Sequence, residues 1–126
     1  SNVSIKNVVA FHEQHGKLAT VTAVHPSSRF GELSIEDNMV EVFQEKPQVH
    51  SGWINGGFFV FQREVLDLIR GDDEILEQGL LVKLATMKQL AVYQHDGFWQ
   101  CMDTYREMEL LNELWKTGQT PWAVWR

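Results

Sequence analysis

The segment LATVTAV, Leu18 to Val24, is the stretch from which the fold can be worked out. Its apolar and β-branched residues predict a buried strand, which Pro26 closes soon afterwards. Upstream, SIKNVVAFHEQHG (4–16) places apolar residues at helical spacing, with Ser4 as a cap at the start and Gly16 at the end. A helix that leads directly into a buried strand indicates an α/β arrangement.

A β-hairpin is predicted next, over GELSIEDNMVEVFQEKP (31–47). Apolar and polar residues alternate on either side of an Asp37-Asn38 turn, as in a strand pair with one half-buried face. A short apolar strand follows at residues 57–61, and LAVYQHD (90–96) predicts another. The hairpin strands pair locally, whereas the other strands lie far apart in the chain.

Helical periodicity returns in the second half of the chain. We expect an amphipathic helix in REVLDLIRGDD (63–73) and a second helix over about Glu74 to Lys88. A third helix, in TYREMELLNELWKTG (104–118), starts at an N-cap that is either Asp103 or Thr104. The apolar side of the first consists of Val65, Leu66 and Ile69.

Helices that alternate with strands predict an α/β sandwich, and the hairpin makes its sheet mixed. The sequence has 126 residues without an internal repeat or a Pro/Gly linker, so we expect a single domain over residues 3–126. Ser1 and Asn2 are interpreted as a scar of tag removal and are given no structural weight.

The charge and cysteine content limit the partners of the chain. With 17 acidic against 11 basic residues, its net charge of −6 argues against a general binder of nucleic acid or of anionic membranes. Cys101 has no second cysteine with which to pair, which fits a reducing cytoplasm. No stretch approaches the roughly 18 apolar residues of a membrane span. We therefore expect a cytoplasmic protein.

Glu45-Lys46-Pro47 ends a predicted strand, and ligands of open α/β sheets bind at the carboxyl ends of strands. Lys46 offers three donors to a phosphate, whereas Glu45 can accept from two vicinal sugar hydroxyls. Pro47 biases Lys46 towards an extended backbone. The alternative is a charged strand end that is simply solvated.

Glycine-containing segments provide further candidates. In Asn55-Gly56-Gly57 the glycines permit close approach of a ligand and the amide can donate to or accept from a hydroxyl, but a turn or a bulge is the plainer reading. Arg29 and Gly31 precede a hairpin strand, where the glycine either leaves room for a sugar ring or makes a turn.

Asp103 stands at the start of a helix, where a carboxylate is either an N-cap or a ligand for a hard cation such as Mg²⁺. His12 and His15 are three residues apart on a helix, a weak indication of a metal site. Trp99, like the other tryptophans, is more typical of a core or an interface than of a stacking platform. No motif for a Ser or Cys nucleophile is present.

Taken in order, HGKLATVTAVHP, RFGEL, FQEKP, GWINGGFFV, DGFWQCMDT and PWAVW resemble the C-terminal half of the glucose-1-phosphate cytidylyltransferase family, within the sugar-nucleotidyltransferase superfamily. The resemblance runs from about Val3 to Arg126. It implies an incomplete three-layer α/β/α sandwich, the C-terminal half of a Rossmann-like nucleotidyltransferase fold.

The resemblance also implies a reaction, in which glucose 1-phosphate attacks the α-phosphorus of CTP with Mg²⁺, giving CDP-glucose and pyrophosphate. Glu45 would bind glucose hydroxyls and Lys46 the sugar phosphate. Asn55 and the backbone at Gly31 would line the sugar pocket. Asp103 would be one of two carboxylates on the metal. Weaker candidates for pocket walls are Arg29, Gly56 and Trp99.

The sequence departs from this family in one respect, because it contains no GGxGTRL loop to cradle nucleotide phosphates. We therefore expect a truncated protein that keeps a weak sugar-phosphate pocket, lacks turnover by itself and does not hold Mg²⁺ tightly. The alternative is a non-enzymatic protein that self-associates through an exposed sheet edge, as a homo-oligomer, or binds a partner. In a third reading, a separate chain supplies the nucleotide-binding half.

Overall fold

The computed structural model describes residues 1–27, 32–44 and 52–125. The chain divides into two compact units. The first, here called the sheet unit, consists of Ser4–Ala23 and Asn55–His95. The second, the hairpin unit, consists of Ser1–Val3, Val24–Ile54 and Asp96–Arg126. The single domain expected over 3–126 stays a prediction.

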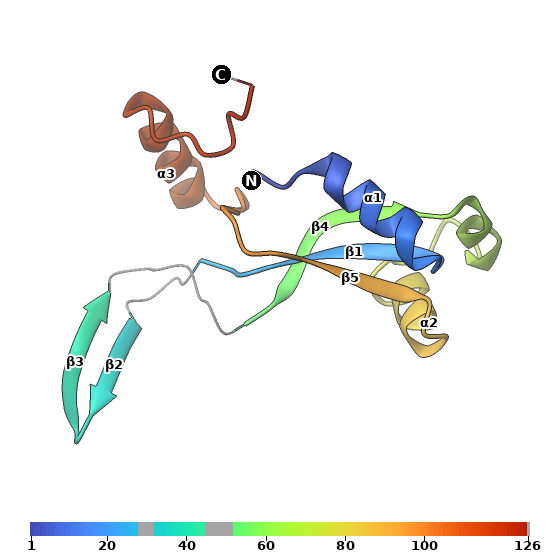
Figure 1. Cartoon of the computed structure of the whole chain (residues 1–126), viewed down its shortest axis with the longest axis horizontal. Helices are drawn as coiled ribbons and strands as arrows, with labels where there is room; N and C mark the ends of the chain where they lie inside the picture. The colour runs from blue at the N-terminus through green and yellow to red at the C-terminus, as the bar shows by residue number, and fades with distance from the viewer. Residues whose placement is uncertain (28–31, 45–51, 126) are drawn as a thin grey trace. The chain divides into compact units, whose positions relative to one another are not determined.

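The sheet has three strands, β1 (Ala19–Val24), β4 (Ile54–Phe61) and β5 (Leu90–His95), in the order β4-β1-β5. Ala19 N donates to Gln89 O at 3.0 Å, which joins the starts of β1 and β5, so these strands run parallel. Gln62 N donates to Leu18 O at 2.8 Å, which joins the end of β4 to the start of β1, so β4 runs the other way (Figure 1). The sheet is therefore mixed, as predicted, but its antiparallel strand is β4 and not part of the predicted hairpin, which forms a separate two-stranded sheet.

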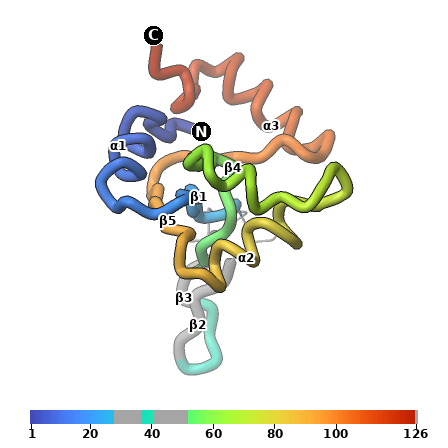
Figure 2. The backbone as a smooth tube through the Cα atoms, turned by 90° about the vertical axis from the view of Figure 1, so that its right-hand side faces the viewer, coloured from blue at the N-terminus to red at the C-terminus, as the bar shows by residue number. Residues whose placement is uncertain are grey.

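Two helices cover opposite faces of this sheet, α1 (Ile5–His15) and α2 (Leu80–Thr86) (Figures 1 and 2). The caps of α1 are those predicted: Ser4 Oγ accepts from Asn7 N at 3.3 Å, and Gly16 has a left-handed φ of 68°. The predicted α/β/α layering is thereby confirmed.

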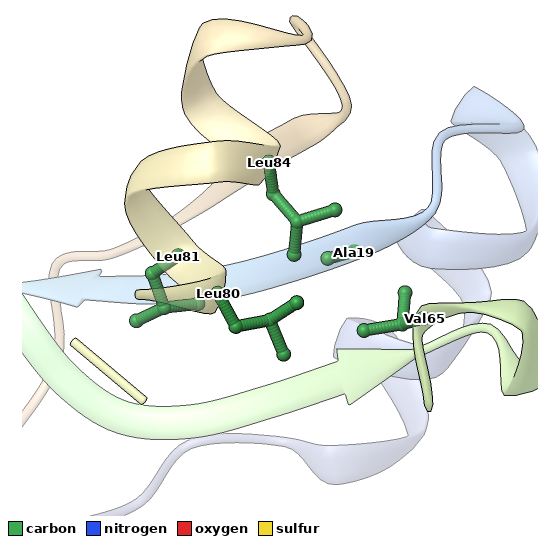
Figure 3. Packing of buried hydrophobic residues seen from close by; sticks show 5 residues of the cluster. All are labelled: Ala19, Val65, Leu80, Leu81 and Leu84. Atoms are coloured by element: carbon green, nitrogen blue, oxygen red, sulfur yellow. The ribbon is translucent and has the colours of Figure 1, made fainter. Parts of the chain in front are cut away.

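The core of the sheet unit lies between α2 and the sheet. It is a cluster of buried apolar side chains (Figure 3), namely Ala19, Val65, Leu80, Leu81 and Leu84. On α1, Val8 is buried as well. β1 carries buried residues along nearly its whole length, which confirms the predicted buried strand, and it lies between β4 and β5 in the sheet.

Two predicted helices differ from those found. Residues Arg63–Leu68 form a 3₁₀ helix, η1, in place of an amphipathic α-helix. Side chains three residues apart lie on one side of a 3₁₀ helix, so Val65 and Leu68 face the core while Leu66 and Ile69 are exposed. The second helix is also shorter than the range 74–88, because α2 begins only after Gly79, a poor helix former.

The hairpin is confirmed, with β2 (Glu32–Glu36) antiparallel to β3 (Met39–Gln44). Asp37 and Asn38 both have positive φ, at 50° and 64°, as a tight hairpin turn requires. The register shifts once, between Ser34 and Ile35. Most residues of the predicted half-buried face have side chains that the structure does not describe.

The hairpin unit also contains α3 (Tyr105–Lys116), which has no buried residue. Asn2 N donates to Phe98 O at 3.2 Å, so Asn2, which was given no weight, contributes a backbone hydrogen bond to this unit. Among the helices of the described ranges, none is both long and apolar enough for a membrane span.

Candidate functional site

The residues predicted for a site fall into two groups. Those outside the described residues are Arg29, Gly31, Glu45 and Lys46. Those within them are Asn55, Gly56, Trp99 and Asp103. Asn55 and Gly56 belong to the sheet unit, whereas Trp99 and Asp103 belong to the hairpin unit. The geometry is therefore described within each unit.

Asn55 is an exposed residue near the start of β4. This strand begins at Ile54 rather than at residue 57, so Asn55-Gly56-Gly57 lies inside the strand. Gly57 has a φ of 83°, and its N–H donates to Asn55 Oδ1 at 2.8 Å. The side-chain oxygen thus stabilises an irregularity in the strand, and the amide NH₂ is the group suited to donate to a ligand.

Asp103 precedes α3 but is not its N-cap. Thr104 is the cap, since its Oγ1 accepts from Glu107 N at 3.2 Å, and Glu107 Oε2 accepts in return from Thr104 N at 3.0 Å. Glu107 Oε2 also accepts from Asp103 N at 2.8 Å. Because Thr104 and Glu107 satisfy the start of the helix, the exposed Asp103 carboxylate is not needed for capping. Its predicted role as a metal ligand stays a prediction.

Cys101, Asp103 and Glu107 bring one ligand atom each to within 4.8 Å of one another. Cys101 Sγ donates to Glu107 Oε1 at 3.3 Å. Mg²⁺ prefers oxygen ligands and completes its shell with phosphate and water, so the Asp103 carboxylate fits this ion and the thiol does not. The hydrogen bond from the Asp103 backbone is the largest cause that lowers the pKa of Glu107.

The two histidines of α1 do not form a metal pair in this structure. His12 Nδ1 and His15 Nε2 both bind Thr20 Oγ1, at 2.8 and 2.6 Å. The second nitrogen of His15 accepts from Lys17 N at 2.8 Å. These bonds attach α1 to β1 and engage the nitrogen atoms that a cation would need.

Sequence reasoning missed a cluster that follows the ends of the parallel strands. His25 comes directly after β1 and Asp96 directly after β5. The ring of His25 lies 3.8 Å from that of Trp53, centroid to centroid, and its Nε2 is 3.0 Å from Asp96 Oδ1. The rule that led to Glu45, a polar residue at a strand's carboxyl end, would also have identified His25.

In open α/β sheets ligands bind at the carboxyl ends of the strands, where this chain has the polar residues His25 and Asp96. The family model for nucleotidyl transferases matches residues 2–113, and the chain belongs to this family. The resemblance read from the sequence motifs is thereby confirmed.

Two curated relatives match almost the whole chain. Glucose-1-phosphate cytidylyltransferase of Salmonella typhi is 46% identical over 125 residues, which cover 99% of this chain and 49% of the relative. The probable glucose-1-phosphate cytidylyltransferase of Bacillus subtilis is 40% identical over 126 residues, again 99% and 49% of the two chains. The chain therefore spans about half the length of these curated relatives.

A solved structure shares the fold. It is a putative glucose-1-phosphate thymidylyltransferase from Bacillus anthracis in complex with a sucrose, with a TM-score of 0.58 and 18% identity. The match covers 89% of this chain and 49% of that one. At this level of identity the likeness supports the nucleotidyltransferase fold alone.

Proposed function

We propose that this chain is the sugar-phosphate-binding half of a glucose-1-phosphate cytidylyltransferase-like protein. The observation that carries the proposal is the 46% identity to the Salmonella typhi cytidylyltransferase along 99% of the chain. The full reaction would join glucose 1-phosphate to CTP and release pyrophosphate, leaving CDP-glucose. Since the sugar phosphate itself attacks phosphorus, the protein's task is to position it and to balance charge.

Each proposed residue has a separate task in holding the sugar phosphate. Lys46 binds the phosphate as a compact cation, and Glu45 accepts from the sugar hydroxyls. The Asn55 amide donates to a sugar oxygen, since its own oxygen is engaged by Gly57 N. The backbone at Gly31 also lines the sugar pocket. The residues with a smaller contribution are Arg29, Gly56 and Trp99.

Asp103 would hold Mg²⁺ through its exposed carboxylate, with water and phosphate oxygens as the other ligands. The ion, when bound, would neutralise charge on the phosphates. The 126 residues contain no GGxGTRL segment. We therefore propose that they bind sugar phosphate without turnover when they are assayed by themselves.

Calorimetric titration of glucose 1-phosphate in the presence of Mg²⁺ tests the proposal. Lys46→Ala should weaken binding about tenfold or more, because a charge-assisted phosphate contact is lost. Lys116→Ala removes the same charge from an exposed lysine that pairs with Glu113 in α3, and it should leave the affinity unchanged.

Two results would contradict the proposal. One is that the wild-type chain does not bind glucose 1-phosphate, or that Lys46→Ala binds it as well as wild type. The other is that the chain alone makes CDP-glucose from CTP and glucose 1-phosphate at a rate typical of an enzyme, which would refute the lack of turnover.

A second candidate is a protein that associates with itself through the sheet. In the part of the chain that the structure describes, β4 and β5 are the two edges of the sheet, and Val92 on β5 is 47% exposed. Sedimentation equilibrium would show a dimer or a larger assembly that Val92→Lys weakens. A monomer at the highest attainable concentration would exclude this candidate.

A further inference from the structure

His15 is the last residue of α1, at the point where the helix leads into β1. Its Nδ1 accepts a hydrogen bond from the backbone N–H of Lys17 at 2.8 Å, across the left-handed Gly16. Its Nε2 lies 2.6 Å from Thr20 Oγ1 on β1. One imidazole therefore binds both the turn that follows the helix and the strand that comes after it.

The bond from Lys17 determines which ring nitrogen of His15 carries hydrogen. A nitrogen that accepts a hydrogen bond uses its lone pair, so Nδ1 bears no hydrogen. The ring is then neutral with its hydrogen on Nε2, which donates to Thr20 Oγ1. A proton added at Nδ1 would face the Lys17 N–H, donor against donor, and would break this bond.

The titratable groups of α1 and of the turn after it also favour a neutral His15. The ring of His12 lies 5.1 Å from that of His15, centroid to centroid, and Lys17 adds a positive charge. Burial is the first cause that lowers the pKa of His15 from its ordinary value of 6.5, and His12 and Lys17 are the next. A helix end by itself favours a protonated histidine. The neighbours therefore outweigh the negative end of the helix.

The sheet presents uncharged groups to this end of α1. Thr20 of β1 contributes a hydroxyl, and Tyr93 of β5 contributes a ring that packs against Phe11, with centroids 5.6 Å apart. Phe11 in turn lies edge-on to His15, with centroids 5.0 Å apart. These contacts hold the imidazole in place, but neither provides the negative charge that would stabilise a protonated ring.

We propose that His15 makes the attachment of the end of α1 to β1 sensitive to acid. The neutral ring joins the Lys17 backbone to Thr20, whereas the protonated ring loses the bond to Lys17 and lies near its positive side chain. The folded state binds fewer protons at His15 than the unfolded state does. The attachment is therefore present above the ordinary pKa of 6.5 and is lost as the pH falls through the lower, folded value.

The release is confined to the last turn of the helix, because His12 attaches α1 to the sheet separately. Its Nδ1 lies 2.8 Å from Thr20 Oγ1, and its Nε2 lies 3.1 Å from Nε2 of Gln62, which follows β4. Val8, one turn earlier in the helix, is buried. Acid therefore frees the turn at Lys17 while the body of α1 stays on the sheet.

NMR of the full chain between about pH 8 and about pH 5 tests the proposal. The His15 ring should titrate below 6.5, and the Lys17 amide signal should move with the same midpoint. Relative to the unfolded rate at each pH, the protection of the Lys17 amide against hydrogen exchange should fall about threefold or more on acidification, because one hydrogen bond is lost. The Val8 amide, which donates to Ser4 O at 3.0 Å, should stay protected.

Three variants separate the bonds of His15 from general effects of acid. His15→Asn supplies an oxygen that can accept from the N–H two residues later but does not titrate, so the Lys17 amide should be equally protected at both ends of the range. His15→Phe keeps a ring against Phe11 and removes both bonds, so this amide should lack protection at every pH. His95→Asn, at the end of β5, should retain the wild-type pH dependence.

Three results would overturn the inference. A His15 ring that titrates at 6.5 or above would show that the fold does not favour its neutral form. Loss of protection at Val8 together with Lys17 would mean that acid unfolds the sheet unit as a whole. An equal pH dependence in His15→Asn and the wild type would mean that another group controls the Lys17 amide.

Discussion

The side-chain oxygen of Asn55 accepts a hydrogen bond from the backbone N–H of Gly57, at 2.8 Å. This bond helps to keep Gly57 at a φ of 83°, a conformation that disfavours residues with a Cβ. One half of the Asn55 amide is thus structural, and the other half, the NH₂ group, remains the donor that we assign to the sugar. The two roles can be separated by mutation.

Asn55→Asp should preserve the structural role and remove the binding role. The carboxylate still accepts from Gly57 N, so the melting temperature should stay close to that of the wild type. The NH₂ donor is replaced by a negative charge beside an anionic ligand, so the affinity for glucose 1-phosphate should fall about tenfold or more. Calorimetry and thermal melting measure the two effects.

Asn55→Ala is the control, since it removes both roles and should also cost about 1 kcal/mol of stability. If Asn55→Asp binds glucose 1-phosphate as tightly as the wild type, the amide does not contact the sugar.

The parts of the fold that the sequence predicted are those with local signals. Ser4 and Gly16 cap the helix that lies between them, and Asp37-Asn38 makes its turn within two residues. Such signals act through backbone groups a few positions away, so they are readable in a single sequence. The 3₁₀ helix was mispredicted because its apolar spacing, seen at Val65 and Leu66, was assigned to a 3.6-residue period.

The parts that could not be predicted depend on residues far apart in sequence. His25 and Asp96 are separated by 71 positions, and their contact exists only because β1 and β5 run parallel and end side by side. No local pattern marks either residue as a partner of the other. For Asp103 the sequence left two roles open, and the capping by Thr104 and Glu107 excluded one of them.

The start of α3 should make the stability of the protein depend on pH through Glu107. Hydrogen bonds, chiefly from Asp103 N and next from Cys101, lower the pKa of this carboxyl from its ordinary value of 4.5. The folded state then binds fewer protons than the unfolded state. The stabilisation is therefore present above the ordinary pKa and is lost as the pH falls through the lower, folded value.

Glu107→Gln should flatten this dependence, because an amide does not titrate but can still take part in a capping box. Melting temperatures measured between about pH 6 and about pH 3 would show a smaller decline in the variant than in the wild type. Parallel declines in the two proteins would mean that Glu107 contributes nothing to acid sensitivity.

Cys101 should react slowly with alkylating reagents. Burial is the first cause that raises the pKa of its thiol, and the hydrogen bond to Glu107 is the second. Because the thiolate is the nucleophile, a raised pKa reduces the reactive fraction at neutral pH. Iodoacetamide should modify the folded chain more slowly than the chain unfolded in denaturant.

The same Glu107→Gln variant tests whether Glu107 raises the pKa of the Cys101 thiol. Removing this neighbouring charge should accelerate the alkylation of Cys101 in the folded protein. Equal rates for the folded and the denatured wild type would refute the prediction.

The central strand offers a matched pair of threonines. Thr20 and Thr22 are both fully buried on β1, yet Thr20 Oγ1 binds His12 and His15, whereas Thr22 Oγ1 has no hydrogen-bond partner within the described residues. A buried hydroxyl without a partner has lost its water without compensation. The same substitution should therefore have opposite effects at the two positions.

Thr22→Val should raise the free energy of unfolding by about 1 kcal/mol, because valine fills the same space without a polar atom to desolvate. Thr20→Val should lower it by about 1–3 kcal/mol, because the polar groups of His12 and His15 lose their shared partner. Urea unfolding of both variants measures the difference in sign. A destabilised Thr22→Val variant would show that the Thr22 hydroxyl is hydrogen-bonded in the folded protein.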